Sequence, residues 1–275
     1  IREHDGKMIL SHWLTKAGVA ISCPTVQVTE TTDLSLLPKI PGNEWLLQSP
    51  LVVKPDQLIK RRGKSGLIGL NLHFDEVKTW ITERMNKPFT IGKTTGTLDT
   101  FIIEPFVPHA QSDEYYIAIH STRDHDIILF HHEGGVDIGD VDGKALSFNG
   151  PLEGTALDLT QLEATLLKNI PAQRKPIVLS FISELYSLYQ KLHFCYLEIN
   201  PLVFNEKANN LAILDLAAKV DEAAAFLVQK QWSLAISQPQ LDFPPPFGKA
   251  MTKDEQIIHD LDAKTGASLK LTVLN

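Results

Sequence analysis

LVVKPDQLIKRRGKSGLIGLNL, residues 51–72, joins a buried-strand pattern to a basic loop and a second short apolar run. Lys54 stands at the end of the first apolar run, and four cations surround Gly63 and Gly66. Glycine lets backbone N–H groups approach an anion, and a guanidinium such as that of Arg62 makes paired contacts with phosphate oxygens. The stretch therefore fits a polyphosphate site, but a solvated basic turn has the same pattern and is the more frequent origin of a basic run.

A second candidate site begins where a predicted strand, residues 100–104, meets Pro105. A strand that breaks at proline leaves backbone groups of residues 105–107 available to read the edge of an adenine ring. A carboxylate such as Glu114 can accept hydrogen bonds from ribose hydroxyls. The alternative is a crossover between domains with a proline kink.

A third candidate site lies on two neighbouring strands near the C-terminal third of the chain. Asn200 ends the run Glu-Ile-Asn-Pro, and Asp215 stands between Leu214 and Leu216 in an apolar strand. A buried carboxylate is costly unless it is paired or binds a metal. Oxygen ligands of this kind suit Mg²⁺, so the sequence favours a magnesium site over a structural role.

Two further patterns carry weaker signals. His131 and His132 are adjacent, so on a strand they point to opposite faces and favour a structural role over a shared metal. Asp262, Thr265 and Ala267 surround a glycine turn that could hold a hard cation, but an ordinary turn explains them equally well.

The order of predicted elements indicates an α+β (mixed α/β) fold with adjacent strand pairs rather than a doubly wound sheet. Periodicity and turn residues predict helices at residues 4–18, 76–86, 159–169, 176–192 and 220–231. They predict strands at residues 19–28, 51–53, 100–104, 114–121, 126–132, 194–204, 211–216 and 267–274. The glycine-rich and aspartate-rich segment 134–154 is expected to be a loop, and the proline run 244–246 an extended linker.

Composition excludes several classes of protein. The chain has 275 residues, 43% of them hydrophobic, and a net charge of -7, so neither wholesale disorder nor a dedicated nucleic-acid binder is expected. No apolar run is long enough for a membrane helix. Two cysteines cannot build a disulfide framework, which favours a reducing, intracellular compartment. The N-terminal residues do not resemble a secretion signal, and the missing initiator methionine suggests a trimmed segment.

Long, ordered segments of the chain resemble the N-terminal part of ATP-citrate lyase, or the smaller subunit of its split forms. These segments are LVVKPDQLIKRRGKSGLIGLNL, FIIEPFVPHAQSDEYYIAI, LFHHEGGVDIGDVD, FCYLEINPLV, LDLAAKVD, FPPPFG and LDAKTGASLKLTVLN. More distantly, the chain is similar to the succinyl-CoA synthetase β subunit. The resemblance implies an ATP-grasp fold of two lobes with the nucleotide between them. It implies an N-lobe over 15–104, a C-lobe with the magnesium site over 1–14 and 105–240, and a Pro-rich linker leading into a truncated citrate module over 241–275.

The resemblance also implies roles for the residues singled out above. It assigns ATP contacts to one set: Lys54, Arg62, Gly63, Pro105, Val107 and Glu114. It assigns Mg²⁺ to Asn200 and Asp215, and a further ion to Asp262, Thr265 and Ala267. No catalytic residue is expected on this chain, because the phosphorylated histidine of the family lies in a Gly-His-Ala-Gly-Ala type motif that His109-Ala110 does not match.

The function implied is the ATP-binding portion of an enzyme that converts citrate, CoA and ATP to acetyl-CoA, oxaloacetate, ADP and phosphate. Its cofactors would be ATP or ADP and Mg²⁺, with CoA used by the whole enzyme. Its partners would be the citrate-binding and CoA-ligase parts, in a cytoplasmic oligomer. Two alternatives are an acyl-CoA synthetase subunit without the cleavage step and a non-catalytic nucleotide-binding module.

Overall fold

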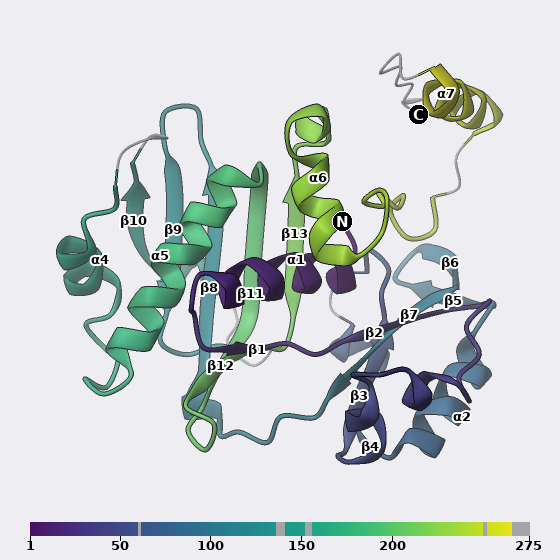
Figure 1. The fold of residues 1–275 in the computed structure, drawn as a ribbon, viewed down its shortest axis with the longest axis horizontal. Helices are drawn as coiled ribbons and strands as arrows, with labels where there is room; N and C mark the ends of the chain where they lie inside the picture. The colour runs from purple at the N-terminus through teal and green to yellow at the C-terminus, as the bar shows by residue number, and fades with distance from the viewer. Residues whose placement is uncertain (60–61, 136–140, 152–155, 250–251, 266–275) are drawn as a thin grey trace.

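Two β-sheets of unequal size form the framework of the protein (Figure 1). The computed structural model describes residues 1–59, 62–135, 141–151, 156–249 and 252–265. Seven strands build the large sheet and four build the small one, and a separate two-stranded hairpin accompanies the small sheet. The arrangement is the two-lobed mixed α/β fold expected from the sequence.

The large sheet has the strand order β1-β12-β11-β8-β9-β10, with β13 also paired to β11. Its strands are β1 (Ile21–Ser22), β8 (Glu114–Ser121), β9 (Asp126–His131), β10 (Leu146–Gly150), β11 (Phe194–Asn205), β12 (Asn210–Ile213) and β13 (Leu216–Val220). Helices pack on the sheet and share one apolar core with it. These are α1 (Glu3–Lys16), α4 (Leu159–Leu166), α5 (Lys175–Lys191) and α6 (Ala225–Ile236). In α5, residues three or four positions apart are fully buried, which fixes the face that the helix turns toward the sheet. Examples are Val178, Phe181, Ile182 and Leu185.

The small sheet has the order β2-β7-β3-β4 and is covered by one helix. Its elements are β2 (Val26–Thr29), β3 (Leu51–Pro55), β4 (Gly69–Leu72), β7 (Thr100–Pro105) and the helix α2 (Phe74–Arg84). The hairpin consists of β5 (Lys87–Ile91) and β6 (Thr94–Leu98). Short helical turns are η1 (Leu37–Lys39), η2 (Glu44–Leu47), η3 (Gly63–Ser65), η4 (Gln111–Asp113) and η5 (Glu222–Ala224), together with α3 (Val141–Lys144).

Most predicted helices and the 114–132 hairpin are confirmed, but several strand predictions were wrong. The strand predicted over 19–28 is two strands in different sheets, because Pro24 interrupts it where the chain passes from the large sheet to the small one. The loop predicted over 134–154 contains β10, which pairs with β9. The β5–β6 hairpin was missed because its residues are mostly exposed and lack a clear apolar alternation.

The strand predicted over 211–216 is not one strand, because it is interrupted at Leu214 and Asp215. β12 ends at Ile213 and β13 begins at Leu216, so Leu214 and Asp215 lie between two strands. β11, which pairs with both, shows a matching shift in register between Ile199 and Leu202, around Asn200 and Pro201. Proline has no N–H to give to a ladder, so an irregularity here has a local cause. Asn200 therefore lies at the register shift in β11, and Asp215 lies opposite it in the gap between β12 and β13.

The last element that the structure describes is α7 (Lys253–Thr265), which follows the proline run and stands apart from both sheets (Figure 1). The strand predicted over 267–274 lies outside the described residues. No helix in the described part of the chain is both long and apolar enough to span a membrane.

Candidate functional site

A cavity of about 550 Å³ lies between the two sheets and is lined by both. The small sheet and the segment after it contribute Lys54, Glu104, Pro105 and Val107. The large sheet contributes Glu114, Asn200 and Asp215. Residues that are up to 161 positions apart in the sequence thus meet in one cavity, and six of them belong to the set predicted from the sequence.

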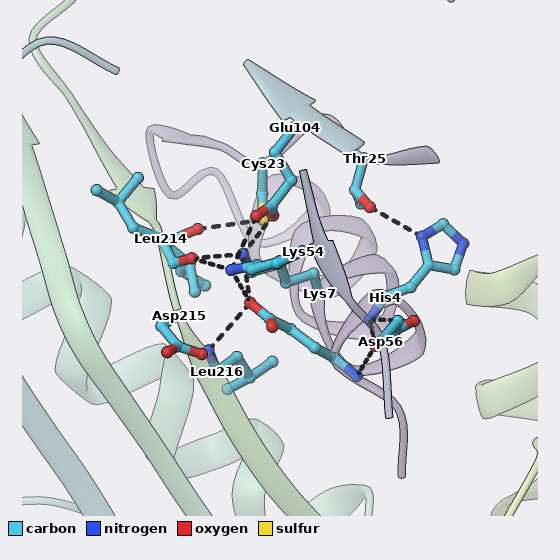
Figure 2. A network of polar contacts seen from close by, with 12 residues as sticks. His4, Lys7, Cys23, Thr25, Lys54, Asp56, Glu104, Leu214, Asp215 and Leu216 are labelled. Carbon is cyan, nitrogen blue, oxygen red and sulfur yellow. Dashed lines mark hydrogen bonds and ion pairs between the residues drawn. The ribbon is translucent and has the colours of Figure 1, made fainter. Parts of the chain in front are cut away.

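Lys54 lies on β3 and is only 3% exposed. Its Nζ atom donates to Glu3 Oε1 at 2.7 Å and to the carbonyl oxygen of Leu214 at 2.7 Å, and it lies 3.0 Å from Glu104 Oε2. An ammonium group has three N–H donors, so each of them has an acceptor. Figure 2 shows Lys54 reaching from the small sheet to the main-chain carbonyl of Leu214, between β12 and β13 of the large sheet.

Lys7, on α1, completes what we call the buried ion cluster: Glu3, Lys7, Lys54 and Glu104. Its Nζ atom lies 2.8 Å from Glu3 Oε1, donates to the Leu214 carbonyl at 3.0 Å, and contacts Glu104 Oε1 (Figure 2). Burial alone would raise the pKa of the Glu3 carboxyl, but Arg62, Lys54 and Lys7 hold that pKa well below its usual range. Two carboxylates and two ammonium groups therefore neutralise one another beneath the cavity.

Arg62 links this cluster to the edge of the cavity. Its Nη2 atom contacts Glu3 Oε2 and donates to Asp215 Oδ1 at 2.6 Å, and its Nη1 atom donates to the Pro55 carbonyl at 2.9 Å. Arg62 is 8% exposed, whereas the Asp215 side chain is 45% exposed. The expectation of a solvated basic loop is wrong at Arg62, and that of a buried strand carboxylate is wrong at Asp215.

Gly63 begins the turn η3 directly after Arg62. A methyl group at Gly63 would meet only Ile68 Cδ1, at 3.6 Å, which is ordinary van der Waals contact. Packing within the protein therefore does not require glycine at this position. Gly66 differs, because its φ of +67° lies in the left-handed region that favours glycine.

The chain leaves β7 at Pro105 and runs along the cavity to β8. Phe106 N–H donates to the Pro50 carbonyl at 2.8 Å, which fixes the start of this segment. His109 lies between the Val107 carbonyl oxygen, 2.6 Å from Nδ1, and Glu114 Oε1, 2.9 Å from Nε2. Pro105, Val107 and Glu114 therefore all line the cavity.

Asn200 and Asp215 are held side by side by the main chain, since Asn200 N–H donates to the Asp215 carbonyl at 3.1 Å. Asn200 Oδ1 accepts from Gly135 N–H at 2.7 Å. Both side chains line the cavity and both supply oxygen atoms. In the described part of the chain, no cluster of three or more histidine, cysteine or acidic side chains could hold a metal, so a cation here would need ligands from water or a phosphate.

Two of the remaining sequence candidates lie in a helix that does not line this cavity, and a third cannot be placed. Asp262 and Thr265 lie in the helix α7 rather than in a glycine turn, and Ala267 lies outside the described residues. His131 is 9% exposed, and its Nδ1 atom lies 2.9 Å from the Glu133 carbonyl, consistent with the structural role expected for it.

Residues 1–232 match the family model of the ATP-citrate synthase ATP-grasp domain. The chain belongs to this family. It is 47% identical over 276 residues to ATP-citrate synthase of Bos taurus, covering 100% of this chain and 24% of that protein. It is 39% identical over 325 residues to the probable ATP-citrate synthase subunit 2 of Schizosaccharomyces pombe, covering 100% of this chain and 66% of that one.

A solved ATP citrate lyase agrees with this assignment. The structure from Methanothrix soehngenii, in complex with citrate and coenzyme A, shares 38% identity with a TM-score of 0.80, over 100% of this chain and 62% of that one. The fold is therefore that of the ATP-grasp domain of ATP-citrate synthase. The chain spans about a quarter of the length of the bovine relative, at 24%.

Sequence reasoning assigned no role at this site to four side chains: Glu3, Lys7, Glu104 and His109. Glu3 and Lys7 come from α1, more than 45 residues before Lys54, and no local motif links them to the basic loop. The available signal was the spacing of Glu3 and Lys7, which places two opposite charges on one helix face that also buries Leu10 and Leu14.

Proposed function

We propose that this chain is the ATP site of an ATP-citrate synthase (lyase). The whole enzyme would convert citrate, CoA and ATP to acetyl-CoA, oxaloacetate, ADP and phosphate through a phosphohistidine and citryl-CoA. The observation that carries the proposal is one cavity between two sheets, lined by the cation Lys54, by Pro105 and Val107 after β7, and by the oxygen-bearing side chains of Glu114, Asn200 and Asp215. These three kinds of group match the phosphates, the base and the metal of a Mg-nucleotide.

The cations would position and neutralise the phosphates. Lys54 lines the cavity, and Arg62, which is not among the lining residues, contacts Asp215 at its edge. The turn at Gly63 follows Arg62 directly. Because every Nζ donor of Lys54 already has an acceptor, a phosphate oxygen must replace one of them. Glu104 and Leu214 both line the cavity, and of these two the Glu104 side chain can turn aside, whereas Leu214 accepts through its main-chain carbonyl. Preorganised cations in a water-poor site stabilise charge that develops on a transferring phosphoryl group.

The nucleoside would lie along residues 105–107 and Glu114. Backbone atoms of Pro105 and Val107 would read the adenine edge, and the Glu114 carboxylate would accept hydrogen bonds from the ribose hydroxyls. The segment suits this role because it runs along the cavity without pairing in either sheet beyond Pro105.

Asn200 and Asp215 would hold Mg²⁺ against the phosphates. These two residues suit the ion, because the Asn200 amide oxygen and the half-exposed Asp215 carboxylate are hard oxygen ligands. A main-chain hydrogen bond also holds the two residues next to each other. Bound there, Mg²⁺ would offset negative charge on the phosphates. Arg62 would have to release Asp215 Oδ1 and turn toward a phosphate, while Glu3 continued to hold it. A second ion near Asp262, Thr265 and Ala267 stays a sequence-based proposal.

The remaining steps belong to other parts of the enzyme. A citrate-binding part and a CoA-ligase and citryl-CoA lyase part, on the same polypeptide or on a second subunit, would supply the phosphohistidine and the cleavage. We expect an oligomer in the cytoplasm. We propose an N-lobe over 15–104, a C-lobe over 1–14 and 105–240, and a Pro-rich linker with the start of a citrate module over 241–275. The pairing of β1 with β12 supports moving the first boundary beyond Ser22.

Calorimetric titration of the purified chain with ADP in the presence of Mg²⁺ tests the proposal. We expect saturable binding with one site per chain. We also expect no acetyl-CoA from citrate, CoA and ATP without the remaining parts. Absence of nucleotide binding would refute the proposed function, and acetyl-CoA formation by the chain alone would refute the division of labour. A partner without a citrate-synthase-like part would favour the synthetase alternative.

A further inference from the structure

His109 connects two separate parts of the proposed nucleotide site. Its Nδ1 atom lies 2.6 Å from the Val107 carbonyl oxygen, on the segment proposed to read adenine. Its Nε2 atom lies 2.9 Å from Glu114 Oε1, the carboxylate proposed to bind ribose. The His109 and Glu114 side chains are 18% and 17% exposed, so the contact is partly shielded from water. Both residues line the cavity.

Hydrogen-bond chemistry fixes the direction of both contacts. A carbonyl oxygen and a carboxylate oxygen are both acceptors, so a ring N–H of His109 is the donor in any hydrogen bond to either of them. One rigid imidazole ring thus spans the distance between the Val107 carbonyl and the Glu114 carboxylate. The bridge therefore ties the Glu114 carboxylate to the backbone of Val107 through a charge-assisted contact.

Glu114 is confined from its other side as well. A Cβ atom built on Gly135 would lie 2.1 Å from Glu114 Oε2, so that oxygen rests directly on the main chain at Gly135. Gly135 has φ of +96°, a conformation that favours glycine, and its N–H holds Asn200 Oδ1. The carboxylate is thus held between His109 and a glycine that also contacts the proposed metal ligand.

We propose that His109 is a positioning residue that sets recognition of the ribose hydroxyls by Glu114. The inference rests on the proposed function. His109 fixes the orientation of the carboxylate before the nucleotide arrives, so that the carboxylate loses little freedom when the hydroxyls bind. Nucleotides that carry both ribose hydroxyls are then preferred over those that lack them.

The ratio of two affinities tests the proposal directly. Calorimetry with Mg²⁺ would give the dissociation constants of ADP and of 2′,3′-dideoxy-ADP for the intact chain. We expect the wild type to favour ADP by about tenfold or more, the size of hydrogen bonds to a charged group. In His109→Ala we expect this ratio to fall several-fold toward unity, mainly through weaker ADP binding.

Two further variants separate positioning from simple loss of packing. His109→Gln keeps a donor near the place of Nε2, so it should retain most of the preference for ADP. His109→Asn keeps a donor only near the place of Nδ1, so it should lose the preference as His109→Ala does. In a Glu114→Gln background, His109→Ala should have no further effect, because the two residues act through one contact.

His125→Ala is the matched control, since His125 lies in the turn between β8 and β9, away from the cavity-lining residues. It should leave both affinities unchanged. A wild-type affinity ratio in His109→Ala, or equal ratios in the Gln and Asn variants, would overturn the proposal. Failure of the wild type to bind ADP at all would instead refute the proposed function, so the two failures are distinguishable.

Discussion

The buried ion cluster forms the floor of the cavity, and Glu114, Gly135, Asn200 and Asp215 form what we call its rim. The floor and the rim use charged residues in opposite ways. On the floor, Glu3, Lys7 and Lys54 are almost completely buried and neutralise one another with Glu104. On the rim, the Asp215 side chain is 45% exposed and shares one oxygen with Arg62. Burial makes the floor residues part of the fold, whereas the rim residues can exchange partners with a ligand at small cost.

The largest loss of stability is expected from a substitution in the buried ion cluster that forms the floor. Glu3→Gln would leave Lys7, Lys54 and Arg62 with less negative charge than they need, and uncompensated buried charge costs about 3–5 kcal/mol of unfolding free energy. Denaturant unfolding of the two proteins measures the loss. A loss below about 1 kcal/mol, the value typical of exposed pairs, would show that the floor is not a buried cluster.

Asp5 provides the matched contrast on the same helix. It is 2% exposed, its Oδ1 atom has no hydrogen-bond partner among the described residues, and burial, with Asp56 and Asp242, raises its pKa to about 7. Because the folded state holds this proton more tightly than the unfolded state, stability falls as pH rises from about 4 to about 7.

Asp5→Asn removes this titration. At pH 8 the variant should be more stable than the wild type by on the order of 2 kcal/mol, and the difference should shrink as pH falls toward 4. The same change of charge thus stabilises at Asp5 and destabilises at Glu3. Melting temperatures across this pH range check the prediction; a variant destabilised at every pH would contradict it.

Gly135→Ala tests the rim where it is most crowded. The added methyl group would collide with Glu114 Oε2, and the positive φ would be strained, so we expect a loss of about 1–3 kcal/mol in unfolding free energy. ADP affinity should fall as well, because Glu114 must move. Gly63→Ala is the control, since its methyl group meets only one carbon at 3.6 Å. Equal stability losses in the two variants would contradict this account.

The sequence predicted the rim better than the floor. Asn200, Asp215 and Glu114 stand in short motifs whose chemistry can be read locally, and the structure places all three on one cavity. Glu3 and Lys7 pair with residues about 50 to 100 positions away, which no local pattern encodes. The basic loop looked exposed in the sequence because the carboxylates that bury Arg62 come from α1 and from the β12–β13 break.

The burial of Lys54 and Arg62 changes the expected effect of replacing them. If Lys54 and Arg62 were exposed, replacing them would weaken nucleotide binding and leave folding almost intact. Since both are buried and paired, Lys54→Ala and Arg62→Ala should lower the unfolding free energy as well as ADP affinity. The rim therefore offers the cleaner test of function.

The most direct measurement is the ADP affinity of wild type and Asp215→Asn, each with and without Mg²⁺. The amide retains an oxygen that can accept from Arg62, so stability should change by no more than about 1 kcal/mol. We predict that Asp215→Asn loses most of the gain in affinity that Mg²⁺ gives the wild type, while metal-free ADP binding stays nearly unchanged. A lowered melting temperature together with wild-type dependence on Mg²⁺ would contradict the assignment of Asp215 as a metal ligand.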